Sequence, residues 1–173
     1  MVRDGSIFAH IGITLFETVV SFAIVTASGI CVAVLLWASR SASEILDPYL
    51  VMLNSLPKSA LAPMLIVWMG SHVHTIIAAA VSVAVFGSIL TLHTGFLSMD
   101  PDKIRLIYAL GGSKKDVLTK VLLPGSVPLI LSNMKVNVGL CLVGVIIGEF
   151  LAARRGLGYL IIYGSQVFSC VYI

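Results

Sequence analysis

The chain has 173 residues, of which 58% are hydrophobic and 11% charged, and its formal net charge is +3. A soluble domain carries about 25% charged residues, so this composition excludes an ordinary soluble globular domain. The charge is small and no basic stripe is interleaved with aromatic residues, which argues against nucleic-acid binding. We therefore expect an all-α polytopic transmembrane bundle of about four to five spans, with 1–173 forming a single domain.

The first predicted span is a charge-free run from Thr18 to Ser39. Its length corresponds to about 33 Å of helix, which is enough to cross the hydrocarbon core of a bilayer. His10 and Glu17 precede this run and are expected at the membrane interface. A short polar connection, Arg40–Asp47, is predicted to follow the span.

The next apolar stretch, Pro48–Gly70, is long enough to span a bilayer but is interrupted by Pro57, Lys58 and Pro63. Interrupted spans often line a transport path, which makes Asn54, Pro57 and Lys58 candidate path residues. A simple kinked helix, with Lys58 extending toward the interface, explains the same residues equally well. A turn at Ser71–His74 and a third charge-free span, Thr75–Met99, are predicted next.

The interval Asp100–Pro124 is the long polar segment of the chain and holds five of its eleven Lys and Arg residues. Its pattern predicts two short helices joined by a tight turn. The first helix begins near Pro101, with Asp100 as its N-cap, and ends at Gly111-Gly112, because glycine accepts the left-handed conformation that closes helices.

Ser113 is predicted to begin the second helix of this interval, with Asp116 three residues later completing a capping-box pattern. Its apolar face is formed by Val117, Leu118, Val121 and Leu122. An amphipathic pair of this kind could simply lie on lipid headgroups as a cytoplasmic loop. The positive charge places the interval on the cytoplasmic side of the membrane.

The spacing within the interval carries a more specific signal. Gly111, nine intervening residues, Val121, one residue and then Leu123-Pro124 resembles the EAA loop of bacterial ABC-transporter permeases. The chain departs from that motif at its first three positions, where Arg105 replaces the acidic residue. The resemblance implies that the helix pair docks into a groove of an ATP-hydrolysing subunit. The implied coupling residues are Arg105, Leu106, Ala109, Gly111, Gly112, Ser113, Lys114, Asp116, Val121, Leu123 and Pro124.

Further motifs are similar to permeases of the nitrate, sulfonate and taurine type: Leu46-Asp47-Pro48, Leu53–Pro57, Ala60–Pro63, Trp68-Met69-Gly70 and Gly156–Ile161. The resemblance implies a bacterial inner-membrane importer subunit that moves a small solute, such as a sulfonate, nitrate, taurine or a vitamin precursor, by alternating access. The implied partners are an ATPase, a second permease copy, an extracytoplasmic substrate-binding protein and the lipid bilayer. Such permeases usually have one more span before the first one here and a complete final span where this chain breaks off, so we expect a partial chain.

The apolar segment after the loop, Gly125–Phe150, contains Asn133, Lys135 and Glu149. A charge within a span is costly and usually faces protein or water, which makes these three residues candidates for the translocation path. The structural alternative is a Lys135 side chain that extends to the interface and an interfacial Glu149. Arg154 and Arg155 follow on the outer side, where they would suit an anion.

An ATP-independent ion-coupled transporter or channel is the alternative function, with the interrupted span, Lys135 and Glu149 as its site. Such a protein would have no need of the spacing around Gly111. We expect no enzyme activity, cofactor or metal site. No phosphate-binding loop occurs, His72 and His74 do not share a helix face, and the three cysteines lie in apolar runs without ligand spacing.

Overall fold

The computed structural model describes residues 6–152 and 155–171, which form helices and turns without any strand. This confirms the expectation of an all-α protein. The helices are α1 (Ser6–Ala38), α2 (Arg40–Ser55), α3 (Lys58–Met69), α4 (Val73–Leu97), α5 (Pro101–Ala109), α6 (Lys114–Val117), the π turn η1 (Leu118–Leu122), α7 (Leu123–Gly125), α8 (Val127–Ala152) and α9 (Leu157–Val171).

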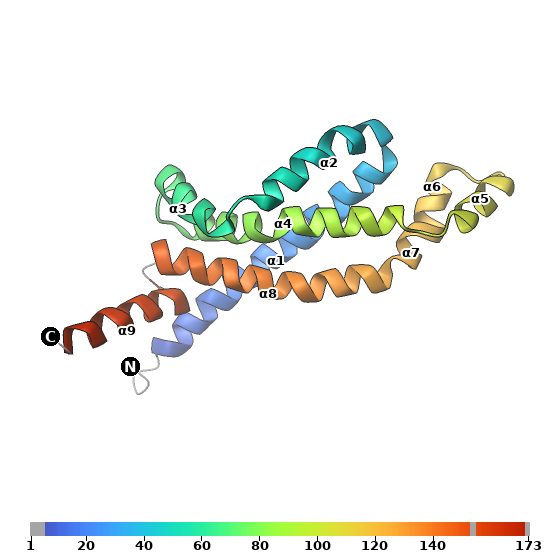
Figure 1. Ribbon diagram of the computed structural model, residues 1–173. Helices are drawn as coiled ribbons and strands as arrows, with labels where there is room; N and C mark the ends of the chain where they lie inside the picture. Colours follow the sequence, from blue (N-terminus) through green and yellow to red (C-terminus); the bar gives the residue numbers. More distant parts are fainter. Residues whose placement is uncertain (1–5, 153–154, 172–173) are drawn as a thin grey trace.

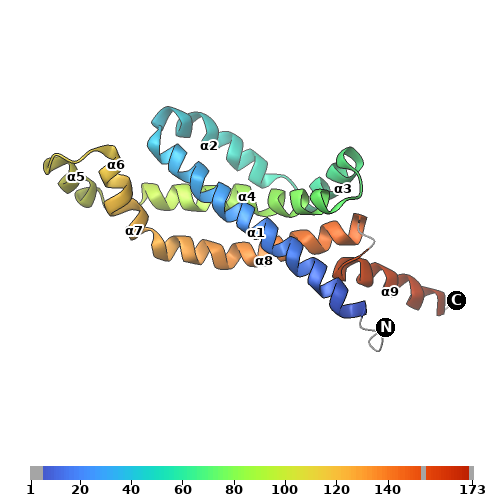
Figure 2. The same ribbon diagram turned by 180° about the vertical axis from the view of Figure 1, so that it is seen from behind.

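Three long helices form the body of the molecule. Helices α4 and α8 run side by side, and α1 packs against both (Figure 1). The segment α5–α7 projects beyond one end of this body, which we call the inner end. The view from behind shows α9 and the start of α1 at the opposite, outer end (Figure 2). The turn between α3 and α4 also lies at the outer end.

The lengths and composition of the helices agree with a polytopic membrane protein. Three of the described helices are long and apolar enough to cross a bilayer, at Ile7–Ala38, Val73–Leu97 and Val127–Ala152. Helices α2 and α3 pass the same test together as one broken span, with a bend of 97° between them. The structure therefore contains three to four candidate spans in its described part, in keeping with the lower expected number.

Small residues allow the long helices to approach each other closely. A Cβ atom added at Gly144 of α8 would lie 2.7 Å from Ala80 Cα of α4, closer than real Cβ contacts allow. A Cβ at Gly29 of α1 would lie 2.7 Å from the Ser88 hydroxyl oxygen of α4. Such backbone proximity is characteristic of helix packing in membranes, where lipid supplies no hydrophobic drive for association.

The predicted start of the first span is wrong. Helix α1 begins at Ser6, not near Thr18, and its candidate span begins at Ile7. Glu17 therefore lies within the helix, where the other helices bury its side chain. Thr14, Glu17 and Ser21 are all buried because they lie on the side of α1 that packs against the other helices.

The predicted connection at Arg40–Asp47 is wrong as well, because these residues form the first half of α2. The Ser39 hydroxyl accepts a hydrogen bond from Ala42 N and caps this helix. The predicted interruption is confirmed at Pro57, which lies between α2 and α3, whereas Pro63 lies inside α3 and does not break it.

A pair of glycine substitutions in α8 tests the packing of α8 on α4. Gly144→Ala should destabilise the protein by about 1–3 kcal/mol, because its methyl group would clash with backbone atoms. Gly139→Ala is the matched control, since nothing lies within 4 Å of its added Cβ and alanine favours helices. Unfolding of the two variants in detergent by added SDS would measure the difference. Equal stability would contradict the close contact.

Candidate functional site

Buried side chains in the second half of the projecting segment α5–α7 attach it to the bundle. Val117 and Leu122 are fully buried, although the segment around them is polar. Leu122 joins Ala33 of α1 with Leu92 and Phe96 of α4 in a hydrophobic cluster at the inner end. The predicted apolar face of the second helix is therefore the face that attaches the segment to the bundle.

A charged side chain adds a second attachment. Lys114 Nζ donates a hydrogen bond of 2.6 Å to the carbonyl oxygen of Ala38, the last residue of α1. The same ammonium lies 5.5 Å from the centre of the Trp37 ring, a cation–π distance. A cation at a helix C-terminus satisfies an end carbonyl and the helix dipole. Lys114 thus ties the projecting segment to the corner between α1 and α2.

The first half of the segment, α5, begins and ends as predicted. Asp100 Oδ1 accepts a hydrogen bond from Asp102 N, and Pro101 occupies the first helical position. Gly111 N donates to Tyr108 O at 3.0 Å and Gly112 N donates to Ile107 O at 2.9 Å. These two bonds form a Schellman motif, for which Gly111 adopts a φ of +78°.

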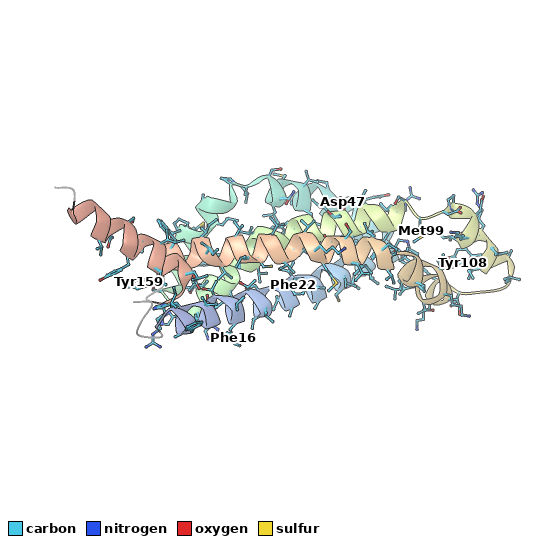
Figure 3. All side chains as sticks on the ribbon, turned by 90° about the horizontal axis from the view of Figure 1, so that it is seen from below. Phe16, Phe22, Asp47, Met99, Tyr108 and Tyr159 are labelled. Carbon is cyan, nitrogen blue, oxygen red and sulfur yellow. The ribbon has the colours of Figure 1, made fainter. Side chains whose placement is uncertain are left out.

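Helix α5 has no buried residue and presents large apolar side chains to its surroundings. Leu106 is 59% exposed, Tyr108 49% and Leu110 75%. Figure 3 shows Tyr108 at the inner extreme of the molecule, far from Phe16 and Tyr159 at the outer end. We call Leu106 and Leu110, which are four residues apart and lie on the same side, the α5 surface. Exposed apolar side chains gathered on a polar protrusion are typical of a protein interaction site.

The start of α6 is fixed by the predicted capping box. Asp116 N donates to the Ser113 hydroxyl, and Asp116 Oδ2 accepts from Ser113 N at 2.9 Å. The Ser113 hydroxyl and Lys120 lower the pKa of the Asp116 carboxyl below its usual range. The ionised carboxylate is therefore the favoured form. The capping box is intact at every pH above the ordinary pKa of an Asp carboxyl, and it is lost only as the pH falls through the lowered pKa of Asp116.

The other predicted coupling residues lie on or beside this segment. Arg105 is exposed and pairs with Asp102 at 3.2 Å on the same helix. Ala109, Gly111 and Pro124 are exposed, and Gly112, Val121 and Leu123 are half-buried. The predicted single second helix contains the π turn η1, in which Leu123 N donates to Leu118 O. The structure brings all the predicted coupling residues into one continuous protrusion.

The candidate path residues do not form a single cluster. Asn133 is buried, and its amide and that of Asn137 donate to the Ser88 hydroxyl at 2.8 and 3.0 Å. Lys135 lies on the exposed side of α8. Asn54 is half-buried on α2 and faces Gly87, and Pro57 is exposed at the bend. The side chain of Lys58 and the whole of Arg154 lie outside the described residues.

Glu149 is fully buried at the outer end, where it holds the start of α9. Its two oxygens accept hydrogen bonds from the Thr14 hydroxyl at 2.6 Å and from Gly158 N at 2.8 Å. Leu157 N donates to the Thr14 hydroxyl, and Gly156 N donates to His10 Nδ1. Three successive N–H groups at the N-terminus of α9 are therefore bound by side chains of α1 and α8.

A contact around His93 was not predicted from the sequence. His93 is buried in α4, with Nε2 3.2 Å from the Ser43 hydroxyl and Nδ1 3.2 Å from Asp47 Oδ1, both on α2. Asp47 lies over α4 in Figure 3. Ser43 and Asp47 are four residues apart, on one helix face, and this spacing is the signal that could have identified the pair. The contact anchors the inner half of α2 to α4.

The chain matches one protein family over most of its length. The family is described as "Binding-protein-dependent transport system inner membrane component", and its model matches residues 19–169. The match includes the whole of α2 through α8 and most of α1 and α9.

Curated relatives carry names of the same kind. The chain is 27% identical over 156 residues to "Formylaminopyrimidine transport permease protein ThiX" of Halalkalibacterium halodurans, a match to 90% of this chain and 62% of the relative. It is 27% identical over 159 residues to "Taurine transport system permease protein TauC" of Escherichia coli, at 91% and 58% coverage. The chain thus spans about three fifths of the length of these relatives.

Removal of the α6 cap tests the local architecture of the protrusion. Ser113→Ala should weaken the first turn by about 1 kcal/mol, which corresponds to roughly fivefold more local opening. Trypsin cleavage after Lys114 and Lys115 should then be faster by a similar factor. Thr119→Ala is the control, because the Thr119 hydroxyl bonds only Lys115 O and caps nothing. Equal cleavage of both variants would show that the capping box does not hold the segment.

Proposed function

Because the chain belongs to the family of binding-protein-dependent transport system inner membrane components, we propose that it is the permease subunit of an ATP-driven importer. The observation that carries this proposal is the protrusion α5–α7. Its apolar side chains Leu106 and Leu110 are exposed at one end, and Leu122 is buried in the bundle at the other. A channel or an ion-coupled transporter has no evident use for such a part. We therefore favour the importer over an ATP-independent carrier.

The α5 surface and the turn at Gly111 are proposed to dock into a groove of an ATP-hydrolysing partner. Leu106 and Leu110 offer apolar anchors of the kind that dominate interface energies when they are desolvated. The exposed Arg105 occupies the position where the resembled motif has an acid, so docking here relies on apolar contact and shape. Ser113 and the proposed coupling residues that follow it in the chain hold the turn in place.

Force from the partner would enter the bundle at the root of the protrusion. Leu122 would transmit it to α1 and α4 through the inner-end cluster, and Lys114 would transmit it to the corner of α1 and α2. The bundle then alternates between inward-open and outward-open states, and ATP binding to the partner favours one of them. This coupling requires a stiff attachment, which the buried Leu122 contact supplies, and the exposed Lys114 hydrogen bond adds a second contact.

The transported solute is proposed to be small, and a binding protein outside the membrane would deliver it. The relatives are named for formylaminopyrimidine and taurine, which supports a small nitrogen-containing or sulfonated solute. Asn54, Pro57, Lys58, Asn133, Lys135 and Glu149 stay candidate path residues. Lys135 is the charged member that faces away from the described helices.

A second copy of the permease is proposed to complete the path. Helix α3 supports this, because Val67 and Trp68 are 89% and 85% exposed on an apolar helix. Lipid and a second copy would each cover such surfaces. The chain itself is a multi-pass inner-membrane component, in accord with its three to four candidate spans.

Truncation of one side chain on the α5 surface tests docking. Leu106→Ala should weaken binding of the ATP-hydrolysing subunit about tenfold, because a desolvated anchor is lost while alanine preserves the helix. The measurement is the affinity of the purified chain, in detergent, for the ATP-hydrolysing subunit of the same transporter. Lys103→Ala is the matched truncation at an exposed polar position of α5. If both variants bind like the parent, the α5 surface is not the docking site.

The conformation of Gly111 gives a second test. A Cβ at this position meets nothing within 4 Å, so Gly111→Val acts through its positive φ alone and should strain the turn by about 1–2 kcal/mol. Uptake per ATP hydrolysed in proteoliposomes should fall. Gly111→Asn should retain coupling, because asparagine tolerates the left-handed conformation. Unchanged uptake in the valine variant would count against the coupling role of the turn.

A further inference from the structure

The outer end contains a cavity that the proposed docking function does not use. Its volume is about 520 Å³, within the range of small-molecule sites. Most of its wall is apolar and comes from α1, the start of α4 and the end of α8, with Ile13, Phe16 and Ile76 as the bulky members. Its polar lining consists of Glu17, Ser71, His72 and Arg155.

Glu17 is the unusual member of this lining. The residue is 1% exposed, and its Oε2 atom has no hydrogen-bond partner among the described residues. An unpaired carboxylate oxygen buried in protein is costly, and such groups normally find a donor. Because Glu17 lines the cavity, a molecule inside the cavity could supply that donor.

A second carboxyl group increases the need for positive charge. Glu149 is buried at the same end of the bundle, and its Oε1 accepts from the Thr14 hydroxyl, which lies one helical turn before Glu17 on the buried side of α1. Glu149 already accepts from the Thr14 hydroxyl and from Gly158 N, both of which are neutral donors. Two buried carboxylates close together cannot both be ionised without a proton or a cation between or beside them.

We propose that the outer cavity binds a small organic cation whose ammonium or amidinium N–H groups donate to Glu17. The positive head replaces the proton that the carboxyl pair otherwise shares, and the apolar body of the ligand packs against Phe16 and Ile76. Binding therefore releases a proton, so affinity rises with pH. This site is independent of the ATPase docking proposed above, because it lies at the opposite end of the bundle.

The other titratable groups near the site act in a consistent direction. His72 lines the cavity and would oppose a cation when it is protonated, which also favours binding at higher pH. His10 accepts from Gly156 N through Nδ1, and this bond requires a neutral acceptor nitrogen. Arg155 is solvent-exposed, so water and salt screen its charge at the cavity rim.

The test uses benzamidinium as the probe and the purified full chain in detergent, with binding measured by isothermal titration calorimetry. Benzamidinium should bind saturably at one site, and Glu17→Gln should weaken it about ten- to a hundredfold, because a charge-assisted hydrogen bond is lost. Glutamine keeps the size of the side chain, and Glu44→Gln, an exposed carboxylate on α2, is the matched control. Thermal unfolding of each variant reports that it is folded.

Two further measurements test the proposal. Benzyl alcohol and benzenesulfonate, which have the same ring without the cation, should bind at least tenfold more weakly than benzamidinium. Benzamidinium affinity should rise with pH in the His72→Gln variant, where only the carboxyl pair can release the proton. Absent benzamidinium binding, equal binding to the Glu17→Gln variant, or preference for the sulfonate would each overturn the proposed site.

Discussion

The burial of Leu122 against the inner end of the bundle is the contact on which the proposed role of this chain depends. Without it, the exposed Lys114 contact would be the remaining described attachment of α5–α7 to the end of α1. The cluster with Ala33, Leu92 and Phe96 makes the protrusion part of the core. Burial of one Leu side chain is worth about 1.5–3 kcal/mol, enough to keep the root attached.

The same bundle is stabilised differently along its length. In the middle of the bundle, small residues such as Gly144 and Gly29 let the helix backbones approach each other. There the Ser88 hydroxyl also accepts hydrogen bonds from two side-chain amides of α8. At each end, polar side chains satisfy helix termini: Lys114 at the end of α1, and Glu149 at the start of α9. Because lipid cannot bond these groups, each unmade contact would be expensive.

Local signals made the protrusion predictable from the sequence. The Asp100 cap, the Gly111 turn and the pairing of Ser113 with Asp116 involve residues within a few positions of one another, so spacing alone defines them. The long helices were also predictable as apolar runs. The start of α1 is not evident from the sequence, because Glu17 looks like the boundary of a charge-free run, whereas a carboxyl group can lie inside a helix when protein covers it.

Long-range contacts could not be predicted in this way. The approach of Glu17 to Glu149, and the pairing of His93 with Ser43 and Asp47, join helices that are far apart in sequence. Each of these residues, taken alone, is compatible with an interfacial position. The Gly156-Leu157-Gly158 run resembles a family motif, but the need for glycine at its first position comes from a tertiary contact. A Cβ at Gly156 would collide with the Glu149 carboxyl group.

The distribution of burial indicates where this bundle can change shape at least cost. Helix α2 has no buried residue, and polar contacts near His93 hold its inner half, whereas α4 and α8 share a close backbone contact. Regions with few buried apolar contacts open more readily than the core. The bend at Pro57 divides α2 from α3, and proline cannot restore the missing helical bond there. In the proposed alternating access, the α2–α3 arm would therefore move more easily than the contacts between α4 and α8, and Lys114 contacts the corner where this arm begins.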